Sequence, residues 1–272
     1  NPFAVIEDAQ QSNKSYRFFG STKFNYAFSN TVSLNSLIGV TFDKVRENTF
    51  MPPLGITPDT LSNAVAYSRL GSRVQRLFSL YNDSYLSYKR VFAGEHALSA
   101  NLGLRFNNAD SEEDAALGYN SPTDDFVTVG SGVNTLRKIG GDIGKYRWLN
   151  TYLNVNYALN SKYLLSVNLA ADGSSRFGTQ ADDALTISGN KFAFLPSVAA
   201  GWLISSENFM ASAKNVDLIK LRASYSLSGN DDIGNYSARQ YYISQNLLGT
   251  QGIIRGNIAN PTLKWETIKT TN

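Results

Sequence analysis

Hydrophobic and polar residues alternate through most of the chain in stretches of about ten residues, whereas a helical period is nearly absent. Over residues 16–28 the even positions are mainly aromatic and the odd positions mainly polar. Because successive side chains of a strand point to opposite faces, this stretch predicts a strand with one apolar and one polar face. The pattern restarts at Val32 after a short polar join, which predicts a hairpin.

The same unit recurs along the chain. Strand pairs are predicted around residues 93–95, around residues 160–162, and across a longer join at about 205–217 that has room for a helical turn. With a last strand opening at Lys264, the units give about nine strands. Segments rich in Gly, Asn, Asp, Ser and Pro lie between them and are predicted to be long loops, at about residues 44–73, 107–145, 173–190 and 229–261.

Short joins that alternate with long loops are the plan of an outer-membrane barrel. The fold class is therefore predicted as all-β, an antiparallel up-and-down meander that forms part of a transmembrane β-barrel. A soluble β-sandwich is the alternative, because its strands alternate in the same way. Aromatic residues near predicted strand ends fit the girdles of a barrel at the two membrane interfaces. They are Tyr16, Phe28, Phe42, Phe92, Phe106, Trp148, Tyr157, Tyr163 and Trp202.

Composition narrows the function classes. The chain has 272 residues with 25 Lys and Arg against 22 Asp and Glu, one His and no Cys. The net charge of +3 is too small for a nucleic-acid footprint, so no nucleic-acid partner is expected. Without cysteine there is no disulfide scaffold, iron–sulfur cluster or cysteine-rich zinc site. No apolar run reaches the roughly 18–20 residues of a membrane helix, and the first ten residues lack the pattern of a signal peptide.

Residues that carry chemistry are few. His96 begins a predicted strand beside a turn and is expected at a surface or interface rather than as a base. Glycines inside strands, such as Gly103, mark a bend or a close approach of another group. Six carboxylates between residues 107 and 125 suit calcium by type, but their spacing is not that of an EF-hand, so a solvated acidic loop is expected. They are Asp110, Glu112, Glu113, Asp114, Asp124 and Asp125. No cofactor, metal or enzymatic activity is expected.

The second half of the chain contains an ordered series of motifs. Residues 171–178 read ADGSSRFG, residues 194–202 read FLPSVAAGW and residues 206–209 read SENF. LIKLRASY begins at Leu218, SGN at Ser228 and NPTLKWET at Asn260. In this order, over about residues 172–267, they resemble the C-terminal barrel region of the SusC/RagA-like TonB-dependent outer-membrane transporters. The motif residues are Asp172, Gly173, Ser174, Ser175, Arg176, Phe177, Gly178, Gly201, Trp202, Gly229, Asn230, Trp265 and Glu266.

The resemblance implies a barrel of about 22 strands with an N-terminal plug inside it. Residues 1–272 are then expected to be a partial barrel domain, with the plug and the terminal strand not present. It also implies TonB-dependent import of a glycan, oligosaccharide or peptide by a multi-pass protein of the Gram-negative outer membrane. The implied partners are a SusD-like surface lipoprotein, TonB acting through the plug, and outer-membrane lipid. A smaller complete barrel acting as a pore or adhesin, and a soluble carbohydrate-binding β-sandwich, are the alternatives.

Two groups of residues are candidates for contacts with substrate or plug. Polar residues on the inner face of predicted strands are expected to line the pathway or hold the plug. They are Asn150, Asn154, Asn168, Asp172, Lys220 and Arg222. Loop tyrosines are expected to stack on a sugar or peptide, although loop aromatics also pack the loop itself. They are Tyr119, Tyr236, Tyr241 and Tyr242.

Overall fold

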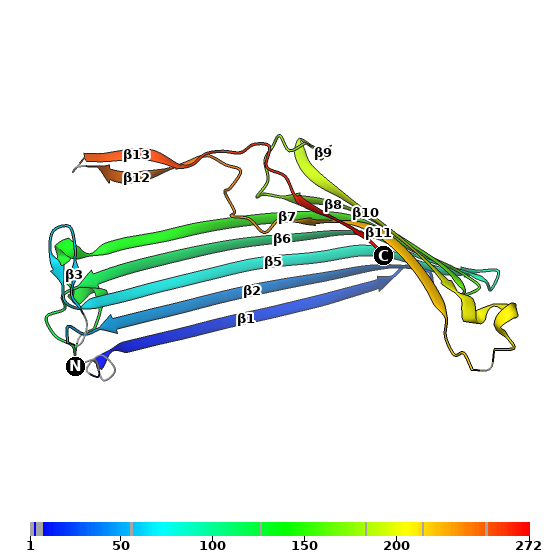
Figure 1. The fold of residues 1–272 in the computed structure, drawn as a ribbon, viewed down its shortest axis with the longest axis horizontal. Coiled ribbons are helices and arrows are strands. Elements are labelled where there is room, and N and C mark those ends of the chain that lie inside the picture. The colour runs from blue at the N-terminus through cyan, green and yellow to red at the C-terminus, as the bar shows by residue number, and fades with distance from the viewer. Residues whose placement is uncertain are drawn as a thin grey trace. The chain divides into compact units, whose positions relative to one another are not determined.

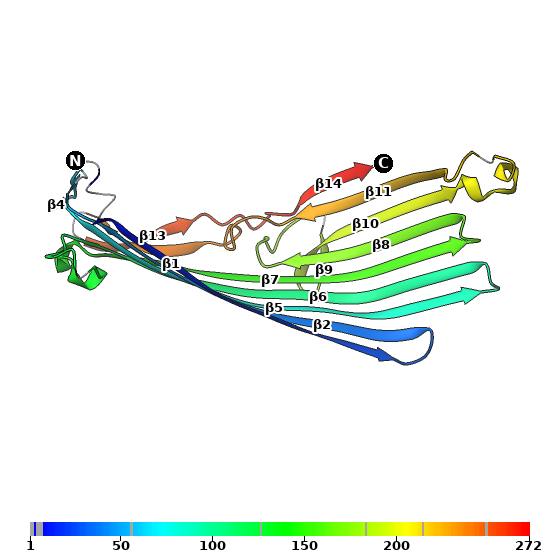
Figure 2. The same ribbon diagram turned by 90° about the horizontal axis from the view of Figure 1, so that it is seen from below.

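The long strands of the protein form one antiparallel sheet in a computed structural model, which describes residues 3, 8–54, 57–125, 127–182, 184–213, 215–247 and 250–272. The strand order is β1-β2-β5-β6-β7-β8-β10-β11-β14, and the short β9 pairs with β10 beside this path. Along this path each long strand lies beside the next long strand of the chain, as Figures 1 and 2 show. The predicted all-β meander is confirmed, and so is the estimate of about nine strands.

The elements follow the predicted joins. The strands of the main sheet are β1 (Gln10–Ala27), β2 (Val32–Met51), β5 (Arg69–Phe92), β6 (His96–Tyr119), β7 (Lys138–Leu159), β8 (Tyr163–Ser174), β9 (Leu185–Ile187), β10 (Asn190–Leu203), β11 (Lys220–Asn230) and β14 (Glu266–Thr271). Two small sheets pair β3 (Asp59–Thr60) with β4 (Val65–Ala66) and β12 (Tyr241–Leu247) with β13 (Thr250–Asn257). The 3-10 turns are η1 (Val129–Ser131), η2 (Asn134–Leu136), η3 (Ile204–Ser206) and η4 (Asn208–Met210).

The join between β10 and β11 holds the turns η3 and η4, as its length predicted. No helix formed by the described residues has both the length and the apolar character needed to cross a membrane.

Several strands are longer than the sequence pattern predicted. Both β5 and β6 have 24 residues, so residues 107–119 continue a strand that was expected to be a loop. The same correction applies at residues 44–51, 69–73 and 138–145. Here ion pairs replace apolar contacts, with Arg73 Nη2 at 2.7 Å from Glu113 Oε2 and Arg76 Nη1 at 2.7 Å from Glu112 Oε2. Positions 73 and 76 face opposite ways, so both faces are polar and the alternation disappears while the strand continues.

The expected acidic loop is therefore wrong for four of its six carboxylates, because residues 110–114 lie within β6. Glu112 and Glu113 are paired with arginines across the sheet rather than free in a loop.

The chain divides into two compact units, each with a small core. One consists of residues 1–20, 40–80 and 109–145, and its buried residues Ala66, Tyr119 and Leu136 pack together. The other consists of residues 21–39, 81–108 and 146–272, where Phe177, Ala181, Ala193 and Trp265 form the cluster. Both cores are too small to explain the chain's apolar content.

Most large apolar side chains of the second unit lie instead on one face of the sheet. Leu102 is 56% exposed, Leu221 is 60% exposed and Leu165 is 44% exposed. A residue adjacent to each of these in its strand points to the other face, and there Asn101, Ser166 and Arg222 are polar. Soluble monomers rarely expose a continuous apolar patch of this kind, so the apolar face is made for another apolar phase.

Candidate functional site

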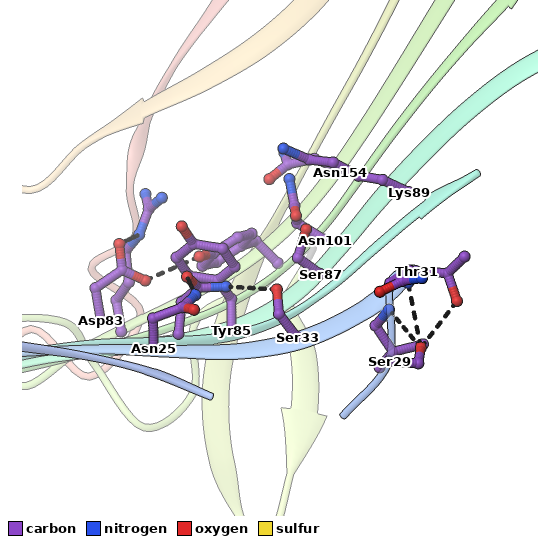
Figure 3. A pocket seen from close by; sticks show the side chains of 15 residues that line it. Asn25, Ser29, Thr31, Ser33, Asp83, Tyr85, Ser87, Lys89, Asn101 and Asn154 are labelled. Carbon is purple, nitrogen blue, oxygen red and sulfur yellow. Dashed lines mark hydrogen bonds and ion pairs between the residues drawn. The ribbon is translucent and has the colours of Figure 1, made fainter. Parts of the chain in front are cut away.

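A cavity of about 490 Å³ lies on the polar face of the second unit (Figure 3). Strands β1, β2, β5, β6 and β7 and the join between β1 and β2 contribute to it. Its side chains are almost all hydrogen-bonding groups. They include Asn25, Ser33, Asn35, Asp83, Tyr85, Ser87, Lys89, Asn101, Arg105, Tyr152 and Asn154. A lining rich in amides and hydroxyls suits a polar, uncharged ligand or another polar protein surface.

Three residues from adjacent strands fix the wall of this cavity. Arg105 Nε donates to Asp83 Oδ2 at 3.1 Å, and the Tyr152 hydroxyl donates to Asp83 Oδ1 at 2.8 Å. The Arg105 guanidinium lies 4.2 Å from the centroid of the Tyr152 ring. A Cβ at Gly103 would meet that ring at 2.3 Å, so the glycine lets Tyr152 lie flat against β6. Gly103 is the only signal in the sequence that pointed to this network.

The predicted asparagines form a ladder across β7, β8 and β10. Asn154 stands opposite Asn168, and Asn150 stands opposite Asp172. Asn154 Nδ2 donates to Asn168 Oδ1 at 2.8 Å, and Asn168 Nδ2 donates to Ser197 Oγ at 3.0 Å. Asn150 donates to the Asp172 carboxylate. The structure thus brings these four predicted residues together on the polar face, where each orients its neighbour.

The predicted cations lie beside a second cavity, of about 620 Å³. Lys220 and Arg222 line it from β11 together with Ser166 and Ser224. Among the described residues, no carboxylate forms an ion pair with either cation. This part of the polar face therefore favours an anionic group.

The predicted tyrosines do not form one site. Tyr119 is buried in the core of its unit and has Lys138 Nζ at 5.8 Å from its ring centroid. Tyr236 and Tyr241 pack edge to face, with centroids 6.4 Å apart. Tyr242 is 60% exposed. Tyr119 is thus the last residue of β6 and packs in the core of its unit, whereas the exposed ring of Tyr242 is accessible to a ligand.

The motif residues meet in a separate cluster at the end of β8. The Asp231 carboxylate accepts hydrogen bonds from Tyr146 at 2.9 Å and from Ser174 at 2.8 Å. Arg176 donates to the Asp231 backbone carbonyl at 2.8 Å and to Asn235 Oδ1 at 3.0 Å. Its guanidinium also lies 4.3 Å from the centroid of the Tyr146 ring. The arginine of the ADGSSRFG motif therefore holds the chain that follows β11.

The same cluster holds the segment that precedes β14. The rings of Phe177 and Trp265 stack with centroids 4.4 Å apart. The Gly178 amide donates to the Leu263 carbonyl at 2.9 Å. A Cβ at Gly178 would overlap the Pro261 carbonyl oxygen, so only glycine fits there. We call the contacts of Arg176, Phe177, Gly178, Asp231 and Trp265 the motif clamp, because they join three segments that are far apart in the sequence.

Another motif residue, Glu207, closes the join between β10 and β11. It accepts hydrogen bonds from Tyr163 at 2.7 Å and from Trp202 at 3.0 Å, and Lys162 Nζ lies 3.3 Å away. The hydrogen bonds from Tyr163 and Trp202 lower the pKa of Glu207 from its ordinary value. The carboxylate thus ties two short joins together on one side of the sheet.

The single histidine, His96, has Nδ1 at 2.7 Å from the Tyr157 hydroxyl. Within the described part of the chain, no group of three or more His, Asp or Glu side chains is placed to hold a metal ion.

Comparisons with known proteins agree with this architecture. The family described as TonB dependent receptor-like, beta-barrel, matches residues 3–272. TonB-dependent receptor P26 of Formosa agariphila is 30% identical over 278 residues, covering 98% of this chain and 26% of the relative. TonB-dependent receptor SusC of Bacteroides thetaiotaomicron is 24% identical over 288 residues, covering 100% of this chain and 26% of the relative.

A solved structure shares the fold. The RagAB peptide transporter superposes with a TM-score of 0.82 at 20% identity, covering 97% of this chain and 28% of that chain. The chain spans about a quarter of the length of the curated relatives it matches. The match to the family and the SusC relative confirm the resemblance found in the motifs. The chain therefore belongs to the TonB-dependent receptor-like β-barrel family, and its location is the Gram-negative outer membrane.

Proposed function

We propose that the protein containing this chain imports a glycan, oligosaccharide or peptide across the outer membrane in a TonB-dependent way. The proposal rests mainly on one observation: the sheet has an exposed apolar face and a polar face that contains a cavity. The first suits lipid and the second suits a hydrated pathway. The relatives support this reading, since one is SusC and another is named a peptide transporter.

Within this function, the chain supplies part of the barrel wall and its loops. The remaining strands and the plug come from the rest of the protein. The amide ladder and the cavity at Asp83 line the pathway or hold the plug, and Lys220 and Arg222 accept an acidic group of the plug. The β12–β13 hairpin that carries Tyr242 meets the substrate or a SusD-like lid. TonB acts through the plug. Proteins of this family are transporters rather than enzymes, and we assign no covalent chemistry to this chain.

Uptake by cells that carry the full-length protein tests the proposal. Labelled oligosaccharides and peptides are offered to cells with and without TonB. We expect uptake of one class to require TonB and to fall several-fold when Asn101→Leu and Asn154→Leu are combined, because both line the cavity. The matched control is Leu102→Ala, which lies next to Asn101 on the opposite face.

The outcomes separate the alternatives. Uptake that persists without TonB identifies a passive pore. Cells that bind ligand without taking it up identify an adhesin. Uptake that is unchanged by the double variant, at equal protein levels, removes the cavity from the pathway.

A further inference from the structure

A cation lies on the apolar face of β5, close to the short join with β6, and within the described residues it has no ion-pair partner. Lys89 lines the polar cavity, so the next residue, Arg90, points to the opposite face. The Arg90 guanidinium lies 4.8 Å from the centroid of the Phe92 ring, which is on the same face. Both side chains are exposed. An arginine held over an aromatic ring keeps its hydrogen-bond donors free for a planar or tetrahedral anion.

The neighbouring strands place two more polar groups beside Arg90. Arg105 Nε donates to Asp83 Oδ2, so these two positions lie across from each other in the antiparallel pair of β5 and β6. In that register Arg90 stands opposite Leu98, and His96 is its diagonal neighbour, within reach of a long side chain. His96 Nδ1 is 2.7 Å from the Tyr157 hydroxyl.

An aliphatic surface adjoins these groups. Tyr157 stands opposite Leu165, which is 44% exposed on the same face. We call Arg90, Phe92, His96 and Tyr157 the rim cluster. It combines a cation, an imidazole and a phenol, and Leu98 and Leu165 continue it towards the middle of the apolar face.

The rim cluster carries the positive charge of Arg90. Among the described residues no carboxylate forms an ion pair with Arg90. Lys162, in the next short join, differs from Arg90 because it has an acidic partner: its Nζ lies 3.3 Å from Glu207 Oε2. An exposed arginine between water and an apolar surface is complemented by an anion that itself sits at that boundary.

Phosphate is such an anion in a membrane, and arginine binds it through two parallel hydrogen bonds. Short joins of outer-membrane barrels lie on the periplasmic side, where the inner leaflet of this membrane has its headgroups. We propose that the rim cluster binds the phosphate of an anionic glycerophospholipid of the periplasmic leaflet, with an acyl chain along Leu98 and Leu165. The proposal rests on the membrane placement of the proposed function, but not on transport.

Native mass spectrometry of the full-length protein in a phosphate-free maltoside detergent tests the site. The probe is phosphatidylglycerol, and diacylglycerol is the matched lipid without phosphate. We expect retained phosphatidylglycerol to fall about tenfold in Arg90→Gln, the loss expected for one charge-assisted contact. Arg90→Lys restores part of it. Lys89→Gln, which removes the same charge from the other face of the strand, leaves lipid retention unchanged.

Three results would overturn the site. They are equal retention in Arg90→Gln and the wild type, equal losses in Arg90→Gln and Lys89→Gln, and equal retention of diacylglycerol and phosphatidylglycerol. Displacement of the lipid by millimolar inorganic phosphate would show that the acyl chain contributes nothing, which also contradicts the proposal. Unchanged migration of unheated samples confirms that each variant is folded. Failure of uptake with intact lipid retention would reject the transport function alone.

Discussion

Glu207 is a single residue on which two short joins of the sheet depend. Its partners Lys162 and Tyr163 are 45 and 44 residues away in the sequence. The SENF motif could be recognised from the sequence, but its role could not, because nothing local predicts which donors a turn carboxylate will meet. The SENF motif therefore has a structural role at this residue, since Glu207 connects two joins of the sheet and does not mark a ligand-binding site.

Acid weakens the hydrogen bonds that Glu207 accepts from the two joins. Because hydrogen bonds from Tyr163 and Trp202 lower the pKa of Glu207, its contribution to stability is complete above 4.5, the ordinary pKa of a glutamate. It is lost as the pH falls through the lowered value. We expect hydrogen exchange of residues 204–213, corrected for intrinsic rates, to become faster below that pH in the wild type. In Glu207→Gln exchange is faster already at neutral pH and changes little with acid. Glu95→Gln, in another short join, is the control, and an equal effect there contradicts the assignment.

At the scale of elements, the long connection from β11 to β14 is organised rather than loose. Asp231 and Asn235 are fixed by Arg176, and Gly178 receives the segment that ends at Trp265. The β12–β13 hairpin lies between these two attachments (Figure 1). The motif clamp therefore sets where the hairpin leaves the sheet. The clamp thus brings together the ADGSSRFG and NPTLKWET motifs, which lie far apart in the sequence.

Removing the clamp's arginine releases the hairpin without unfolding the sheet. In Arg176→Gln the hydrogen bonds to the Asp231 carbonyl and to Asn235 and the stacking on Tyr146 are lost, a cost of about 1–3 kcal/mol. Limited chymotrypsin digestion of the full-length protein in detergent should then cut at residues 241–242 several-fold faster. The control is Arg255→Gln, on β13 itself and outside the clamp. Equal digestion of the two variants would show that the clamp does not hold the hairpin.

The sequence predicted strands where one face is apolar, and it failed where both faces are polar. Alternation identified the sheet near the short joins, for example in β8, because lipid-facing and polar residues differ there. The same strand type continues through Arg73 and Glu113, where ion pairs take over and the pattern no longer distinguishes strand from loop. The network of Asp83, Arg105 and Tyr152 was missed for a related reason, since its members come from three strands whose register sequence alone does not give.

At the scale of the whole molecule, the two faces of the sheet require opposite kinds of side chain on the same strand. Leu102 and Asn101 are adjacent, yet one is exposed on the apolar face and the other lines the polar cavity. In a lipid bilayer a charge on the first position must be desolvated, while a charge on the second stays in water. In a soluble sheet the order would be reversed, because a charge is tolerated at its exposed positions and is costly at its cavity positions.

A pair of arginine substitutions therefore tests the membrane placement of the whole sheet. Leu102→Arg should cost about 2–4 kcal/mol, the range for arginine near the bilayer midplane on the lipid face of a barrel. Asn101→Arg should cost much less, because the cavity is open and polar. The measurement is the folded fraction of the full-length protein refolded into lipid vesicles, read from the migration of unheated samples. If both variants fold equally well, Leu102 does not face lipid. If Asn101→Arg is the more damaging, the faces are reversed, and the import pathway must be sought on the other side of the sheet.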